Sequence, residues 1–414
     1  MKLIIFSAML ALLPCALPAQ EFSTATMRPI TLNEAYTLAL AKSEQLALQA
    51  EGIKQLEAAE QLINAAFRPS FDANASQYKQ QNSASATKGY FSGSYALFSG
   101  MRNYISQKAA AARTGAAKLD LGRARQQLYL NVAQAYLNLH ASQRQIFIRR
   151  EQLEVTKKRI AELQSRVDIG RSRKSEVVAA QTQLAQDKAS CLNAQAAERL
   201  QQQALLFLTG LETDLVPDQI TPHPAAGLED YLKAALLRPD LAASRKALEV
   251  SGFLLDIQQR NLWPTITVSA DYYVVRRPMP APANRWDGTL AVNIPLYNGG
   301  AAQAQRQSAY SAKRSAELAV QLAQRQALTE VRSAYEEYKY SSLQTASLME
   351  ARTLAEDNAR YQAEDYKLGL VTNLDVLSAL NTVQQVRLTL ALARVQENLS
   401  QLQLEIAAGL EIKQ

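Results

Sequence analysis

The feature that most constrains the fold is an internal duplication: segments of the first half of the chain recur in the second half at a constant spacing of 199 positions. Four aligned pairs share that spacing: 128–136 with 327–335, 98–100 with 297–299, 168–170 with 367–369, and 209–211 with 408–410. Separate chance matches do not keep one spacing from a strand to the last helix. We therefore predict two copies of one structural unit, residues 20–215 and 216–414.

Each unit is dominated by helices, because proline is absent from residues 70–216 and 296–414. A helix of roughly 35 residues comes first (32–67, then 228–262). Two short strands follow, and then a very long helix (103–169, then 302–368), which at 1.5 Å per residue is about 100 Å long. Gly170 or Gly369 ends it, and a last helix follows.

A helix of that length cannot bury its apolar side against a partner half as long, so we expect the two shorter helices of each unit to stack end to end along it. The last helix carries apolar residues at alternating spacings of four and three, as in a coiled coil. They are Leu388, Leu392, Val395, Leu399, Leu402 and Ile406.

Four segments alternate with a period of two and are predicted as strands, the clearest being Pro264–Val274 and Thr289–Leu296. About ten residues is the length of a tilted transmembrane strand, and Trp263 and Trp286 lie at strand ends. Four strands cannot close a barrel, and an open edge is not tolerated in lipid. If the strands lie in a membrane, several copies of the chain must share one barrel.

The N-terminus indicates export. Residues 1–19 have Lys2, an apolar run and Ala19, which together are typical of a secretory signal peptide. Cys15 raises the alternative of a lipid anchor, which Pro14 disfavours. Cys191 is the one cysteine after the signal, so no internal disulfide is expected, and no later segment is apolar enough for a membrane helix.

Other function classes find little support. The net charge of +7 comes from Lys and Arg interspersed with acids, without the basic, aromatic-rich block of a nucleic-acid site. The two histidines, His140 and His223, have no Cys or His partner at metal-ligand spacing. With no phosphate loop and no nucleophile motif, we expect neither enzyme activity nor a cofactor.

The ordered elements and several motifs resemble the TolC-like outer membrane factor family. The motifs are Ile294–Gly300 (IPLYNGG), Tyr366–Val371 (YKLGLV) and Leu374–Leu377 (LDVL). The resemblance implies a mainly α fold with a small β part. Long antiparallel coiled-coil helices would form an α-barrel in the periplasm. Four transmembrane strands per chain would form a shared trimeric β-barrel in the outer membrane.

The resemblance also implies a function and partners. A homotrimer would be the passive exit duct of a tripartite efflux system, with a periplasmic adaptor and an inner-membrane pump of RND, ABC or MFS type. Glu176 and Asp375, each six residues past a turn glycine, would direct carboxylates into the closed periplasmic aperture, which would favour cations. Tyr366 resembles a gate residue that hydrogen-bonds between helices. Negative charge at a helix N-terminus also explains both acids.

The two turns after the long helices are expected to contact the adaptor through Gly170, Arg171, Gly369, Leu370 and Val371. They differ in charge, since 170–174 reads GRSRK and 369–373 reads GLVTN. The basic turn either neutralises Glu176 in part or meets an acidic adaptor surface. Two alternative functions stay open: the exit duct of a type I protein secretion system, and a secreted coiled-coil scaffold.

Overall fold

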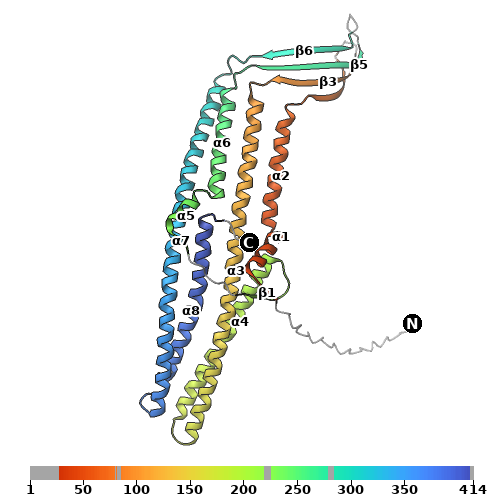
Figure 1. Ribbon diagram of the computed structural model, residues 1–414. Helices are drawn as coiled ribbons and strands as arrows, with labels where there is room; N and C mark the ends of the chain where they lie inside the picture. The colour runs from red at the N-terminus through yellow and green to blue at the C-terminus, as the bar shows by residue number, and fades with distance from the viewer. Residues whose placement is uncertain (1–27, 80, 82–84, 219–224, 278–283, 411–414) are drawn as a thin grey trace, which may run out of the picture.

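The computed structural model describes residues 28–79, 81, 85–218, 225–277 and 284–410. The predicted signal peptide and His223 lie outside these ranges. The molecule is elongated, with a sheet at one end and two helical turns at the other (Figure 1). It is mainly helical with a small β part, as predicted.

The first unit begins with strand β1 (Arg28–Ile30) and helices α1 (Leu32–Lys42) and α2 (Glu44–Ala65). Strands β2 (Ser70–Tyr78) and β3 (Ala86–Phe98) lead into the long helix α3 (Arg102–Asp168), and α4 (Lys174–Thr209) returns along it. Both α2 and α4 pack on α3, one on each half of its length. The predicted stacking of shorter helices along a long one is confirmed.

The second unit repeats this order. Strand β4 (Leu215–Pro217) precedes α5 (Leu228–Ala235) and α6 (Pro239–Gln259), and β5 (Thr265–Arg277) and β6 (Trp286–Asn293) follow. The long helix α7 (Ala301–Leu368) then meets α8 (Asn373–Ala407). Helix α6 packs between α3 and α7, which joins the two units side by side.

The single first helix predicted in each unit is wrong, because both are interrupted. Ser43 has extended backbone dihedrals, and its hydroxyl accepts the Leu46 N–H at 3.3 Å, so it caps a new helix. In the second unit Pro239 occupies the first turn of α6, where its missing N–H costs nothing.

The sheet is antiparallel, with the strand order β2-β3-β5-β6. Strand β6 runs from Trp286 to Asn293, three residues earlier than predicted at each end. Asn293 pairs with Thr265, the first residue of β5, so no partner strand extends further. Pro295, which has no N–H to donate, follows.

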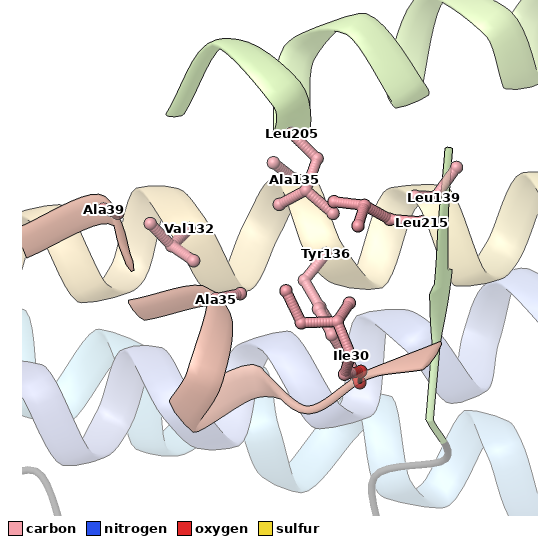
Figure 2. Packing of buried hydrophobic residues seen from close by; sticks show 9 residues of the cluster. All are labelled: Ile30, Ala35, Ala39, Val132, Ala135, Tyr136, Leu139, Leu205 and Leu215. Atoms are coloured by element: carbon pink, nitrogen blue, oxygen red, sulfur yellow. Dashed lines mark hydrogen bonds between the residues drawn. The ribbon is translucent and has the colours of Figure 1, made fainter. Parts of the chain in front are cut away.

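Strands β1 and β4 form a separate parallel pair that sequence patterns did not reveal, because three residues carry no periodic signal. They cover a core built from α1, α3 and α4 (Figure 2). At its centre the buried Tyr136 hydroxyl donates to the Ile30 carbonyl at 2.9 Å, and burial raises the pKa of Tyr136 to about 12. The start of the described chain is thereby fixed midway along the helices.

The coiled-coil seam predicted on α8 is correct at five of its six positions. Leu388, Val395, Leu399, Leu402 and Ile406 are buried, whereas Leu392 is 49% exposed. Four of the buried residues, Val395, Leu399, Leu402 and Ile406, pack against α3 of the first unit, through Tyr129, Ala133 and Leu137. Helix α8 therefore packs on α7 within its own unit and also joins the second unit to the first.

In the described part of the chain, none of the helices combines the length and apolarity needed to cross a membrane.

Candidate functional site

The candidate site is the helical end of the molecule, where α3 turns into α4 and α7 into α8 (Figure 1). Gly170 and Gly369 adopt positive φ angles of 72° and 78°, which suit glycine. The Arg171 N–H donates to the Arg166 carbonyl at 2.8 Å, and Leu370 does the same to Asp365 at 3.0 Å. Both glycines thus close a Schellman turn that satisfies carbonyls at a helix end.

The five predicted contact residues do not share one environment. Gly170, Arg171 and Gly369 are exposed, and Leu370 is 71% exposed. Val371 is half-buried and packs against an apolar cluster at the tip. That cluster draws one or two residues from each of the four helices: Leu163, Val177, Ala180, Tyr366 and Val376. Val371 is therefore both a residue of the second turn and part of the apolar packing beneath it.

Asp375, the third residue of α8, forms a capping box with Thr372. Its Oδ2 accepts the Thr372 N–H at 2.8 Å and the Thr372 hydroxyl at 2.6 Å. These hydrogen bonds lower the pKa of Asp375, so it is a carboxylate at neutral pH. One of its two oxygens is committed to the helix end, and the side chain remains exposed.

Glu176 occupies the matching third position of α4, but its environment differs. The side chain of the N-cap residue Arg173 makes no capping hydrogen bond, so no capping box forms here. The Glu176 carboxylate is bonded to two other side chains. Its Oε2 accepts the Ser172 hydroxyl at 2.8 Å and the Tyr366 hydroxyl at 2.9 Å. Burial, and then the bond to Glu176, raise the pKa of Tyr366, which keeps the phenol protonated at neutral pH. Two of the three predicted gate residues are in contact.

Two arginines of α3 complete the site, and sequence reasoning missed both. The Arg159 guanidinium lies 4.2 Å from the Tyr366 ring centroid, and that of Arg166 lies 4.7 Å away. Arg159 is buried and also donates from Nε and Nη2 to Oδ1 of Asn373, at 3.0 and 2.8 Å. Asn373, the first residue of α8, is buried as well. No local pattern predicts a contact across 214 positions.

The basic first turn leaves Glu176 without a cationic partner. Within the described residues no ion pair joins Glu176 to Arg171, Arg173 or Lys174, and all three cations are exposed. The prediction that the basic turn neutralises Glu176 in part therefore has no ion pair to support it. A set of three exposed cations beside Ile169, which is also exposed, is a surface complementary to acidic groups.

In the ranges that the structure describes, no group of three His, Cys, Asp or Glu side chains is placed to hold a metal ion. His140 lies on α3 well away from the tip, and burial, then Arg144, lower its pKa. What the tip residues do is tie helices together.

Comparison with known proteins finds a family match on both units. The family model described as "Outer membrane efflux protein" matches residues 35–211 and 231–410. The outer membrane efflux protein BepC of Brucella suis biovar 1 (strain 1330) is 24% identical over 311 residues, or 72% of this chain. The chain spans 66% of that relative's length, just under two thirds.

The fold also matches solved structures. A crystal structure of CusC superposes with a TM-score of 0.84 at 19% identity, covering 92% of each chain. The outer membrane protein VceC of Vibrio cholerae superposes with a TM-score of 0.80 at 22% identity, covering 91% of this chain and 96% of that one.

Proposed function

Because the chain belongs to the outer membrane efflux protein family, we propose that three copies form the outer-membrane exit duct of a tripartite efflux system. The strands cross the outer membrane, and the helices extend as a tunnel into the periplasm. The duct conducts passively, without cofactor or catalysis. A periplasmic adaptor and an inner-membrane pump of RND, ABC or MFS type deliver the substrate.

The observation that carries this proposal is the sheet, which has one continuous apolar face. The register places Phe91 opposite Tyr272, Tyr95 opposite Val268, and Val268 opposite Leu290. Because pairing residues share a face, the apolar side chains of adjacent strands line up. The opposite face carries Asp72, Ser92 and Asp271 in one row. An apolar outside and a polar inside are what a membrane channel wall requires.

Among the described strands, the sheet also has two unpaired edges, β2 and β6. Within the chain, β3 of the first unit pairs with β5 of the second. In the proposed ring, β6 of one copy pairs with β2 of the next, and no edge is left in lipid. Three copies supply twelve strands, which is enough for a lumen.

The helices near the sheet support the same arrangement. Helix α6 packs extensively on both α3 and α7, whereas its counterpart α2 has one extensive helix partner among the described residues, α3. The uncovered side of α2 exposes Leu48 and Leu62, and α7 exposes Tyr310, Leu318 and Leu322. We assign α7 of the neighbouring copy as the missing partner of α2.

Nearer the helical tip, corresponding residues of the two units differ in burial, and this difference indicates a second contact between copies. Leu399 and Ile406 of α8 are buried against α3. Their counterparts 199 positions earlier, Leu200 and Phe207 of α4, are 70% and 85% exposed. The counterpart of α3 is α7, which exposes Tyr340, Leu354, Tyr361 and Leu368. In the ring, α4 therefore packs on α7 of the next copy.

The tip is the gate in this proposal. Glu176 and Asp375 place six carboxylates around the aperture of a trimer, and the Tyr366–Glu176 bond holds it closed. The turns at Gly170, Arg171, Gly369 and Leu370 face the adaptor, with the basic turn against acidic groups. Docking there releases the closed state.

Planar lipid bilayers test this function. Purified protein in detergent is added to one side, and the expected result is stepwise, cation-preferring conductance. Membranes from cells that express the chain are extracted with carbonate, and the protein is expected to stay in the pellet. A carbonate-soluble protein without conductance would instead indicate the coiled-coil scaffold.

A further inference from the structure

We infer that the outer mouth of the duct is a binding site for multivalent anions, formed by cations on the polar face of the sheet. The inference rests on the proposed trimer, in which that face lines the lumen. Strand β3 leads into α3 and β5 follows α6, so the helices lie at one end of the sheet. The far end, where β2 and β5 stop and where β3 and β6 begin, is the outer mouth.

The polar face of the sheet changes the sign of its charge along the strands. An acidic row crosses all four strands and consists of Asp72, Ser92, Asp271 and Asp287. Four positions earlier in β3, and therefore nearer the mouth, Lys88 pairs with Arg276. At 3.4 Å per residue this basic row lies about 14 Å from the acidic one. Tyr90 and Tyr273 pair in the row between them.

Three cations belong to the basic end of this face. Lys88 and Arg276 pair directly opposite each other, and like charges in such a pair are destabilising. Arg285 lies next to Tyr273, whose N–H donates to the Arg285 carbonyl at 2.7 Å. Because Trp286 belongs to the apolar face, the alternation of a strand places Arg285 on the polar one.

One carboxylate offsets these three cations. Arg276 pairs with Asp287, Nη1 to Oδ2 at 3.2 Å, and its guanidinium lies 4.1 Å from the Tyr273 ring centroid. Lys88 and Arg285 are exposed, and among the described residues neither of them has an ion pair. Each chain therefore keeps two unbalanced cations at the mouth.

Acids that could balance Lys88 and Arg285 are scarce in this part of the sequence. Residues 73–119 contain no Asp or Glu, and residues 272–316 contain one, Asp287, which already pairs with a cation. The acidic row is about 14 Å away, whereas exposed charges are screened beyond about 8 Å at physiological salt. In the proposed trimer, two cations from each of three chains thus give six unbalanced cations around the mouth.

The chemistry of these groups identifies the class of ligand. Ammonium and guanidinium groups donate hydrogen bonds and accept none, so this end of the lumen suits an anion rather than a neutral solute. A guanidinium binds phosphate or carboxylate oxygens through two parallel hydrogen bonds. An anion with several charges contacts several cations at once, which strengthens its binding over that of chloride. The bound anion cancels the positive charge of the mouth.

Titration calorimetry with sodium tripolyphosphate, on protein in a non-ionic detergent, tests binding directly. The mouth variant carries Lys88→Gln with Arg285→Gln. The control variant, Lys79→Gln with Arg277→Gln, loses the same charge at the same end of the sheet, but Arg277 lies on the apolar face opposite Thr87. We expect at least tenfold weaker binding in the mouth variant and less than threefold in the control. Absent wild-type binding, or equal losses in both variants, would overturn the inference.

Reversal potentials in a KCl gradient test whether the anion binds in the lumen. In the proposed duct the helices stay in the chamber to which protein is added, so the mouth faces the other chamber. Tripolyphosphate in that chamber should raise the permeability ratio of K⁺ to Cl⁻ at least twofold in the wild type and leave the mouth variant unchanged. An unchanged wild-type ratio would overturn the inference. Failure of the proposed function is distinct, since the protein would then give no conductance steps.

Discussion

The hydroxyl of Tyr366 donates a 2.9 Å hydrogen bond to Oε2 of Glu176, joining the last turn of α7 to the first turn of α4. The two residues lie 190 positions apart and belong to different units. Together with the Arg159–Asn373 hydrogen bonds, this bond ties the two helical turns to each other. Its removal is the smallest change that tests the proposed gate.

Tyr366→Phe keeps the ring stacked with Arg159 and Arg166 and removes only the hydroxyl. A hydrogen bond to a charged, half-buried acceptor contributes about 1 kcal/mol, or about fivefold in an equilibrium, for each of three links. We expect a higher resting conductance with an unchanged oligomer mass. Tyr104→Phe, on an exposed tyrosine of α3 far from the tip, is the control. Equal resting conductance in the two variants would show that the Tyr366–Glu176 bond does not hold the gate closed.

The second turn is predicted to contact the adaptor. Gly369→Trp adds bulk at an exposed position with open space around it, so the assembly with adaptor and pump should be lost. Gly369→Asn is the control, because asparagine tolerates the positive φ of this turn. Assembly is measured by in-cell cross-linking and co-purification. Normal export by the Gly369→Trp variant contradicts docking at this turn.

Arg238 is predicted to be the main stabilising cation midway along the molecule. Its buried guanidinium donates to Asp240 at 2.6 Å, to Glu330 at 2.6 Å and to the Ala407 carbonyl at 3.0 Å. Arg238→Met leaves two partly exposed carboxylates without that partner. We expect a loss of about 2–3 kcal/mol in the free energy of unfolding, below the cost for a fully buried pair.

Thermal unfolding followed by helical circular dichroism measures this loss. Arg245→Met provides the comparison, because Arg245 is an exposed residue of α6, the helix that begins directly after Arg238. Similar melting temperatures for the two variants would show that the Arg238 contacts contribute little.

Asp240 gives the unfolding free energy a defined pH dependence. Burial acts to raise the pKa of Asp240, but the hydrogen bonds and charge of Arg238 outweigh burial and lower it. A lowered folded pKa means that the stabilisation is complete above the ordinary aspartate value of 3.8 and is lost as pH falls through the folded pKa. The melting temperature should fall below about pH 4, and less steeply in Asp240→Asn. Identical slopes would contradict this assignment.

The duplication and the long helices were predictable, because helix formation is local and proline marks where it stops. The breaks at Ser43 and Pro239 were missed, although both residues are ordinary helix-start signals. Strand ends depend on the partner strand, which is why β6 ends with Thr265 opposite rather than where its own pattern ends. Leu392 fits the heptad, yet its side chain is 49% exposed.

The predicted gate residues show the same division. Glu176, Asp375 and Tyr366 were identified by family resemblance, and the structure brings Glu176 and Tyr366 together. Arg159 and Asn373 were not identified, because a buried cation and its acceptor on separate helices leave no mark in either local sequence. Tertiary packing alone determines that pair.

The central claim is that one chain is an incomplete wall and that copies of it close a ring. The most direct test is the protein mass of the detergent-solubilised particle, measured by light scattering with the detergent contribution subtracted. We predict the mass of three chains, and a shift to one chain for Leu200→Asp with Phe207→Asp, which places charge on the exposed side of α4. A wild-type particle with the mass of a single chain would contradict the account.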